Sequence, residues 1–233
     1  MNPTQCFRRI PMILALAVCA IALRAQSSAF EGQLALVQTQ LRSLDVASGP
    51  TTLHVAPRTQ SGLALRGAWV WPLKGAWSVD ASLGYRFRTQ SNLDYRVTSG
   101  PSGTLDVKQV LDHQIILGGL VRWTGVATFG VGLDVRQESL SIESSDGTSS
   151  GTLTRAWFRA VARYPLGSSA LRPFIGVELA LPLTKESGDG KAYIGDLDRL
   201  GEPGNPYTGS VAKAHAPSFE FALVFGLRFG GAK

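Results

Sequence analysis

The chain has 233 residues, 44% of them hydrophobic, with 23 basic and 17 acidic side chains. This length suffices for one domain with its own core. Removing residues 1–25 would take away Arg8, Arg9 and Arg24 and no acidic residue, which lowers the net charge from +6 to +3 (20 basic against 17 acidic). So small a net charge gives no indication of a nucleic-acid partner.

Residues 1–25 have the pattern of an export signal. A basic start precedes an apolar run that is too short to span a bilayer, and small residues follow it. We expect cleavage after Ala25, with Ala22 as the alternative, and residues 26–233 as a single domain. Both cysteines, Cys6 and Cys19, lie in the removed part. The mature domain is therefore expected to have no disulfide, no thiolate metal site and no cysteine nucleophile.

Beyond the signal, several runs alternate large apolar residues with small or charged ones. Because successive side chains of a β-strand point to opposite faces, each run predicts a strand with one apolar and one polar face. The clearest runs are residues 77–88, 127–136, 175–183 and 219–229, and weaker ones are 63–73, 113–123 and 153–164. Several approach the ~9–11 residues that cross a bilayer at a tilt.

Residues 32–46 are predicted to supply a further strand, the first of the domain. Leu34, Leu36, Leu41 and Leu44 mix strand and helix spacing, so a helix on the periplasmic side is the alternative. An even strand number, usual for single-chain bacterial barrels, favours the strand. We expect residues 219–229 to close the barrel by pairing with it.

Short and long connections alternate along the chain. Residues 72–75, 123–125 and 165–170 are short, whereas 47–61, 91–103, 143–151 and 184–217 are long and polar. In an up-and-down barrel every second connection lies at the same end, and outer-membrane barrels have short periplasmic turns and long external loops. The sequence therefore predicts an all-β, up-and-down antiparallel transmembrane β-barrel of eight strands.

The polar faces of these strands carry charges that would point into the barrel. Eight strands leave an interior just wide enough for side chains to fill it, and buried charges there must pair. We expect a lumen plugged by a charge network, with an anion-conducting path as the alternative because arginines outnumber acids. The network residues are Arg66, Asp80, Arg86, Arg122, Asp134, Arg136, Arg155, Arg159, Arg163, Glu178, Glu220 and Arg228.

Aromatic residues gather beside the short connections. Aromatic rings that circle one end of a barrel are typical of the headgroup layer, although aromatics are also common in strands generally. We interpret them as a periplasmic aromatic girdle formed by Trp71, Trp77, Trp123, Tyr164 and Phe229.

The alternating strands, the rhythm of the connections and the closing Phe225-Gly226-Leu227-Arg228-Phe229 carry a resemblance. The chain resembles the small eight-stranded outer-membrane barrels of the OmpA transmembrane-domain, OmpX and OmpW type. The resemblance implies a monomer in the outer membrane of a Gram-negative-type bacterium, surrounded by outer-membrane lipid and lipopolysaccharide. It also implies that barrel-assembly machinery reads Phe225, Gly226, Leu227 and Phe229, although residues 230–233 follow where that signal usually ends.

Four residues are candidates for catalysis: His54, Asp112, His113 and His215. Asp112 and His113 are adjacent, so on a strand they would face opposite sides unless a bulge intervenes. The sequence specifies no partner for the other two, and we expect no catalytic site.

No metal or cofactor is expected either. Asp189, Asp196 and Asp198 in the longest connection miss the EF-hand spacing, so a solvated loop is the simpler interpretation.

Three functions and one other fold remain open. The leading hypothesis is a structural or interaction role through external loops that meet an unknown extracellular ligand. The alternatives are an OmpW-like transporter or narrow channel for small molecules, and an enzyme that modifies outer-membrane lipid. A soluble lipocalin-like barrel would need the opposite polarity, with the apolar faces inside.

Overall fold

The computed structural model describes residues 28–48, 51–97, 100, 102–144, 147–167, 171–184 and 210–230. The predicted export signal and the three aspartates of the longest connection lie outside these residues. No helix in the described ranges is both long and apolar enough to cross a membrane.

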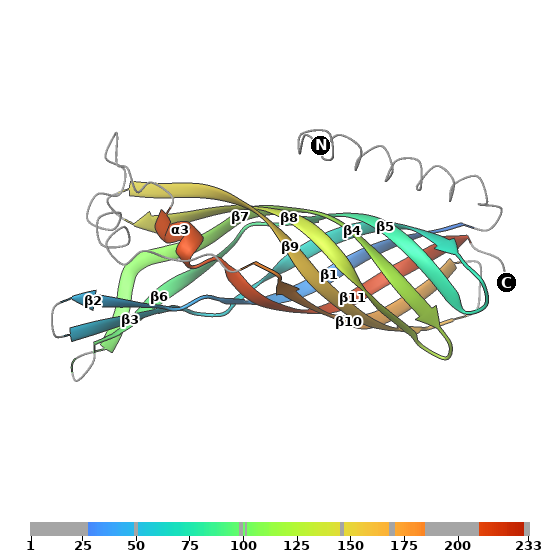
Figure 1. The fold of residues 1–233 in the computed structure, drawn as a ribbon, viewed down its shortest axis with the longest axis horizontal. Helices are drawn as coiled ribbons and strands as arrows, with labels where there is room; N and C mark the ends of the chain where they lie inside the picture. The colour runs from blue at the N-terminus through green and yellow to red at the C-terminus, as the bar shows by residue number, and fades with distance from the viewer. Residues whose placement is uncertain are drawn as a thin grey trace, which may run out of the picture.

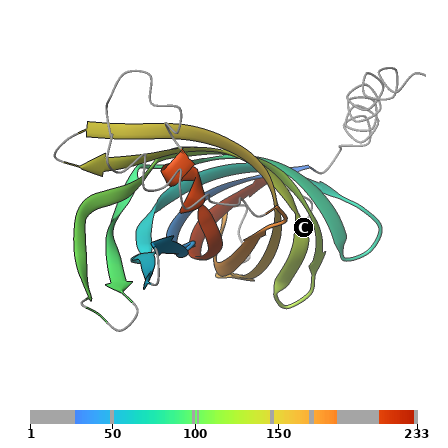
Figure 2. The ribbon, with the colours of Figure 1, turned by 60° about the vertical axis from the view of Figure 1, so that its left-hand side comes forward.

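Eight antiparallel strands close into an elongated barrel (Figures 1 and 2). They are β1 (Ala29–Leu41), β4 (Gln60–Pro72), β5 (Trp77–Arg86), β7 (Ser102–Thr124), β8 (Thr128–Ser144), β9 (Gly147–Pro165), β10 (Leu171–Pro182) and β11 (Pro217–Gly230). Neighbours in the order β7-β5-β4-β1-β11-β10-β9-β8 are hydrogen-bonded, and β8 pairs with β7 to complete the circle. The predicted fold class is confirmed.

The first and last strands seal the barrel. β1 pairs with β11 from Ala29 opposite Gly230 to Leu41 opposite Pro217, as expected for the closing strand. The first strand differs from its predicted range, because it begins three residues earlier than residue 32 and ends at Leu41. The reason lies in its leucines: Leu41 faces inward, and Leu44, three residues later, also packs against buried residues, so the strict alternation of a strand must break between them. After that break the chain starts a separate strand.

The long connections form additional β-structure at one end of the barrel. β2 (Leu44–Ser48), β3 (Thr51–Pro57) and β6 (Thr89–Val97) continue the sheet from the outer part of β7, and β8 and β9 extend alongside (Figure 1). Most of these residues lie in the connections that are predicted to be polar loops. They are strands because hairpins from different connections pair with each other, β3 with β6, which satisfies their backbone groups. We call this the long-loop end.

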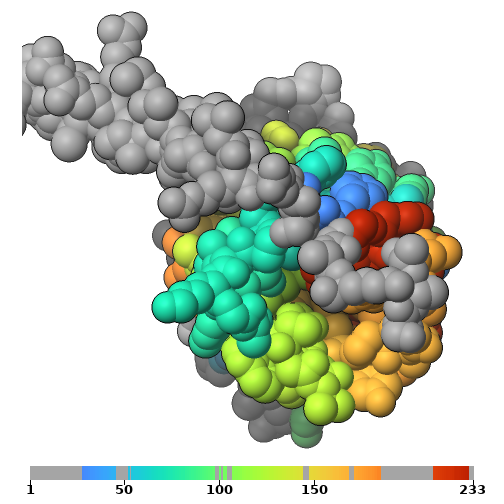
Figure 3. Space-filling model, turned by 90° about the vertical axis from the view of Figure 1, so that its right-hand side faces the viewer, coloured from blue at the N-terminus to red at the C-terminus, as the bar shows by residue number. Residues whose placement is uncertain are grey.

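The opposite end carries the short turns that join β4 to β5 and β7 to β8, together with the end of β9 and the start of β10. These turns surround the mouth of the barrel (Figure 3). Gly75 adopts a positive φ of 68° in the first of them, a conformation that glycine adopts without steric cost. We call this the tight-turn end, and both Ala29 and Gly230 lie there.

The polarity of the barrel is the reverse of a soluble protein. Leu83 and Leu117 on the outer wall are 59% and 57% exposed, whereas Asp134 and Arg159 in the lumen are 0% exposed. A lipocalin-like barrel would bury the leucines and expose the charges, so that alternative is wrong. An apolar outer wall around a polar interior is the arrangement of a transmembrane β-barrel.

Candidate functional site

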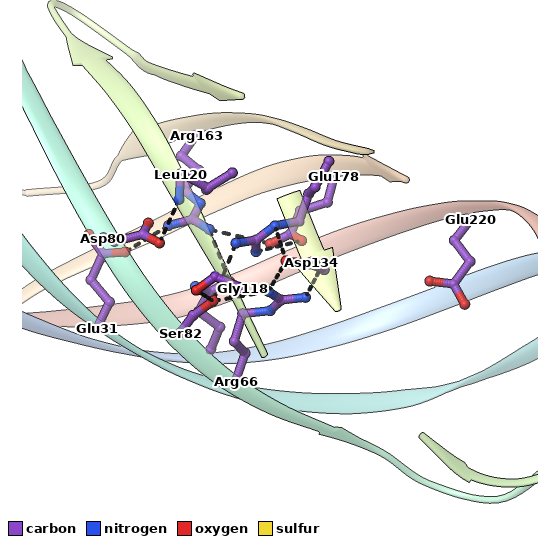
Figure 4. Close-up of polar contacts among 12 residues, drawn as sticks. Glu31, Arg66, Asp80, Ser82, Gly118, Leu120, Asp134, Arg163, Glu178 and Glu220 are labelled. Carbon is purple, nitrogen blue, oxygen red and sulfur yellow. Dashed lines mark hydrogen bonds and ion pairs between the residues drawn. The ribbon is translucent and has the colours of Figure 1, made fainter. Parts of the chain in front are cut away.

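The candidate site is the row of charged side chains inside the barrel. Each barrel strand sends every second side chain inward, so charges two or four residues apart lie on the same face, along the lumen axis. On β8 these are Asp134, Arg136 and Glu138, and on β9 they are Arg155, Arg159 and Arg163. Tilted neighbouring strands then bring opposite charges together (Figure 4).

Asp134 forms the centre of this network. Its two carboxylate oxygens accept hydrogen bonds from Nη1 and Nη2 of Arg66, each at 3.2 Å. Arg136 Nη2 donates to it at 3.0 Å, and Arg159 Nε lies 3.2 Å away. Three guanidinium groups thus surround one carboxylate, and the bidentate Arg66 contact fixes its orientation.

A second group lies toward the long-loop end, where Glu220 stands apart from Asp134 (Figure 4). Glu220 pairs with Arg86 at 2.5 Å and with Arg136. Arg136 also covers the ring of Trp157, 4.3 Å from its centroid, and Arg155 lies on the same ring at 5.1 Å. Trp157 is fully buried, so these cation–π contacts are shielded from water.

Glu138 continues this group farther out. It accepts hydrogen bonds from Arg155 Nη2 at 2.6 Å and from Gln114 Nε2 at 3.0 Å. Arg155 also donates to the backbone oxygen of Pro217 at 2.9 Å, which ties β9 to the start of β11.

The third group lies toward the tight-turn end. Glu31 accepts hydrogen bonds from Arg122 and Arg163, both at 2.7 Å, and Arg228 approaches it at 3.7 Å. Arg122 also pairs with Asp80, and Arg163 reaches Glu178 at 3.3 Å. Glu178 in turn contacts Arg159 of the central group, so the three groups are continuous.

The structure places all twelve predicted network residues in the lumen, and each has an ion pair with another described residue. Two further members of the network, Glu31 and Glu138, are not among the predicted residues. Glu31 precedes the predicted first strand, and Glu138 lies two residues beyond the run that was predicted to end at 136. Both residues continue the alternation of their strands. Extending each predicted strand by two residues, one period of the alternation, would therefore have included them.

These side chains leave little space in the middle of the lumen. The cavity between Arg66, Arg86, Arg136, Glu178 and Glu220 has a volume of about 30 Å³. Because a water molecule needs ~10–15 Å³ of such space, this cavity has room for only one or two of them.

An apolar cluster lies beyond the charges, at the long-loop end. It includes the helix α3 (Ser210–Ala214), whose Ala212 is packed among strand residues of β3, β6, β7, β8 and β9. Gln109 Nε2 donates to the backbone oxygen of Ala212 at 3.0 Å and holds the helix in place. The members are Val55, Leu93, Leu111, Leu140, Ile142, Leu153, Ala212 and Ala216.

The predicted girdle residues lie on the outer wall near the tight-turn end. Trp77 and Trp123 face each other across β5 and β7, and Trp123 stacks on Phe129 with ring centroids 6.4 Å apart. The ring of Phe229 lies beside that of Phe30, with the two ring centroids 6.4 Å apart. Tyr164 is exposed and Trp71 half-buried. Three further aromatic residues, Phe30, Trp69 and Phe129, are not among the predicted members, although their side chains also point outward on the same wall.

The residues of the expected assembly signal are on β11. Phe225, Leu227 and Phe229 face outward, and Gly226 faces the lumen. A Cβ at Gly226 would stand 2.2 Å from the Phe174 ring, so this glycine makes room for an aromatic side chain. Its recognition by assembly machinery stays a prediction.

The four catalytic candidates do not come together in the structure. Asp112 contacts Ser141 at 3.3 Å, whereas His113 stacks on Tyr85, despite a bulge between Leu111 and His113. His215 is buried and contacts the backbone oxygen of Arg42.

His54 is the only one of the four with a described carboxylate partner, Asp45, at 2.6 Å on the exposed β2–β3 hairpin. Within the described ranges no group of three or more His, Cys, Asp or Glu side chains could hold a metal ion.

The fold and the charged lumen together define a transmembrane β-barrel of eight strands. No family model matches the chain, and no curated protein matches it in sequence. Among solved structures, Ail of Yersinia pestis, in complex with the heparin analogue sucrose octasulfate, is 10% identical with a TM-score of 0.47, over 88% of this chain and 100% of Ail.

Two further solved structures are similar at the same level. The outer-membrane protease OmpT of Escherichia coli is 10% identical with a TM-score of 0.43, over 88% of this chain and 97% of OmpT. OprG of Pseudomonas aeruginosa is 11% identical with a TM-score of 0.41, over 87% and 96% of the two chains. Likeness at these identities concerns the fold alone.

Proposed function

We propose that this chain is an integral outer-membrane barrel with a structural or interaction role, and that its long-loop end is the external, partner-facing part. The observation that carries this proposal is the pairing of β3 with β6, which turns separate connections into one ordered sheet beyond the barrel. A sheet of this kind presents fixed side chains, as a binding surface requires. Charged pairs such as Arg58 with Asp94 and Arg88 with Glu143 lie on it and suit an aqueous surface.

The lumen supports a closed barrel rather than a channel. Its inner wall carries paired charges, the central cavity has room for only one or two water molecules, and an apolar cluster lies at the long-loop end. Removing one member of a buried pair costs ~3–5 kcal/mol, so the network resists opening. A lateral path for small apolar molecules would need an apolar lumen. The lumen of this barrel is charged, so the OmpW-like alternative is disfavoured.

Topology labelling tests the external assignment. The predicted mature chain has no cysteine, so single-cysteine variants His54→Cys and Lys74→Cys report the long-loop and tight-turn ends. A membrane-impermeant maleimide should label His54→Cys in intact cells and Lys74→Cys only after lysis. The opposite pattern, or labelling of both in intact cells, contradicts the proposal.

Conductance measurements test the closed lumen. The purified mature protein in planar bilayers should give no stepwise conductance, and Arg159→Ala should behave in the same way. Steady channels in the wild type would instead support the transport alternative.

We also propose that the protein is not an enzyme. The described catalytic candidates are dispersed, and His54 with Asp45 forms an exposed cross-strand pair. Lipid A mass spectra from expressing cells should be unchanged, and peptides incubated with the protein should remain intact.

A further inference from the structure

A cavity of about 430 Å³ lies at the long-loop end, where β10 and β11 separate. The ladder between these strands ends at the pair of Ala180 with Glu220, although β10 continues to Pro182 and β11 begins at Pro217. A proline has no backbone N–H to donate, which fits the end of the ladder at this point. Both prolines line the cavity, so it occupies the gap between the two strands. Its volume is within the range of small-molecule sites.

The cavity extends from the outer wall of the barrel toward the lumen. Leu181, whose side chain is 48% exposed on the outer wall, lines it on one side. Arg155, which is 4% exposed and belongs to the charge network of the lumen, lines it on another. A space that is apolar toward the bilayer and charged toward the protein matches a molecule with an apolar part and an anionic part.

The cavity also lies at the height where the apolar outer wall ends. The outward side chains of β10 are apolar from Leu171 at the tight-turn end to Leu181 beside the cavity. At ~3.3 Å per residue and a tilt of ~40°, this stretch rises ~25 Å, which is the height of the apolar band of a transmembrane barrel. On β1 the outward residues likewise change from Leu36 to Gln38 and Gln40 toward the long-loop end. The cavity is therefore level with the lipid headgroups.

Two cations at the cavity have no ion pair with a described residue. They are Arg42, directly after β1, and Lys213 on α3, and both are half-buried. The third cation, Arg155, is balanced by Glu138 at 2.6 Å, and Glu220 is held by two other arginines of the lumen. No acidic side chain is among the described residues that line the cavity. Arg42 and Lys213 therefore give the cavity a positive charge that no described carboxylate balances.

The donors of these two cations can reach a ligand. Of the three guanidinium nitrogens of Arg42, only Nη1 is enclosed without a hydrogen-bond acceptor, so Nε and Nη2 remain accessible, as does the ammonium group of Lys213. Backbone contacts hold the two segments together. The Arg42 N–H donates to the Ala216 oxygen at 3.3 Å, and the Arg42 oxygen accepts from His215 Nδ1 at 2.7 Å. These contacts keep both cations on one cavity, and such preorganisation favours binding.

We propose that this cavity binds a phosphorylated lipid of the outer leaflet. The phosphate lies between Arg42 and Lys213, because a guanidinium group matches phosphate oxygens in pairs and an ammonium group adds a mobile point charge. The acyl chains run down the outer wall over Leu181 and Leu179, which are 48% and 43% exposed. The inference rests on the proposed external position of the long-loop end, since that position determines which leaflet supplies the lipid.

Thermal unfolding of the mature barrel in an uncharged detergent, followed by gel mobility, measures binding as lipid A is added. The variant is Arg42→Gln/Lys213→Gln. The matched control is Arg96→Gln/Lys108→Gln, which removes the same charge from exposed strand positions at the same end, outside the cavity. Lipid A should raise the unfolding temperature of wild type and control. The variant should need at least about tenfold more lipid for half of the effect, since one lost charge-assisted hydrogen bond is worth that much.

Gel mobility without heating verifies that each variant is folded, and the single variants Arg42→Gln and Lys213→Gln replace the double variant if it is not. Dephosphorylated lipid A and inorganic pyrophosphate test the two parts of the ligand separately, and each should act more weakly than lipid A. Pyrophosphate that stabilises the wild type as well as lipid A does would assign a free anion and overturn the lipid. Equal responses of variant and control, or no response of the wild type, overturn the site itself.

The lipid site and the external position of the long-loop end can fail separately. Binding in detergent does not depend on the orientation of the barrel, whereas maleimide labelling of His54→Cys does. Lipid A binding that is lost in the variant, together with labelling in intact cells, supports both. The same binding with labelling only after lysis overturns the assignment to the outer leaflet.

Discussion

Gly118 on β7 stands against Asp134 on β8, and a Cβ on Gly118 would lie 1.9 Å from Asp134 Oδ1. The absence of a side chain on one strand therefore creates the space that the central carboxylate occupies. Arg66 and Arg159 converge on that carboxylate, so a backbone position on β7 determines whether β4 and β9 can be bridged through it.

Replacing Gly118 with valine should displace Asp134 and break its contacts with Arg66 and Arg159. Because the added atoms overpack a filled interior, we expect a loss of about 1–3 kcal/mol before the broken ion pairs are counted. Unfolding of the barrel in urea, followed by gel mobility, measures it. Gly32→Ala is the control, since nothing lies within 4 Å of a Cβ at that outward position. Equal stability of the two variants would contradict the packing argument.

Asp134→Asn keeps the shape of the side chain and removes its charge. Three buried arginines then lose their shared partner, which should cost ~3–5 kcal/mol of unfolding free energy. Asp94→Asn is the matched change at the exposed Arg58 pair, where ~0–1 kcal/mol is expected. Denaturant titration of both variants distinguishes a structural lattice from charges that merely line the wall. Similar small losses in both would count against the lattice.

His215 should make the long-loop end sensitive to acid. Burial lowers the pKa of His215 from 6.5 to about 4, with the nearby Arg42 charge acting in the same direction and the hydrogen bond to its backbone opposing it. Because the folded pKa is depressed, the neutral form is favoured in the fold. Stability is therefore intact above pH 6.5 and falls as the pH drops toward 4, by up to about 3 kcal/mol.

Hydrogen exchange of the segment around α3 at pH 7 and pH 5 measures this effect. Faster exchange is expected at pH 5 after correction for intrinsic rates. His215→Gln should abolish the difference, whereas His54→Gln on the exposed hairpin should leave it unchanged. A difference that persists in His215→Gln would assign the pH response to another group.

The tryptophans should report the two sides of the barrel wall. Trp77 and Trp123 are half-exposed on the outer wall, and Trp157 is fully buried in the lumen. In single-tryptophan variants reconstituted in bilayers, brominated lipid should quench Trp77 or Trp123 strongly and Trp157 weakly, because quenching needs contact. Equal quenching of all three would argue against a lipid-facing outer wall.

The alternation of residues was sufficient to assign the faces of the strands. Local parity determines the side to which a strand residue points, so Asp134 and Arg159 could be assigned to the lumen and Leu83 and Leu117 to the lipid without any tertiary information. The rhythm of short and long connections added the strand number and the arrangement of the two ends. Glu31 and Glu138 were missed because strand ends, unlike strand faces, have no periodic signal.

Pairing between distant residues was decided only by the tertiary structure. Arg86 contacts Glu220, which lies 134 positions farther along the chain. The two side chains meet because the tilt of the strands and the closure of the barrel determine which residues of different strands lie at the same height in the lumen. The pairing of β3 with β6 likewise depends on two hairpins lying side by side at one end. The sequence by itself therefore determined which residues enter the lumen and which face lipid, since that follows from the period of a single strand. Which charges meet, and that the long connections form a sheet, follows from the closed geometry of all eight strands.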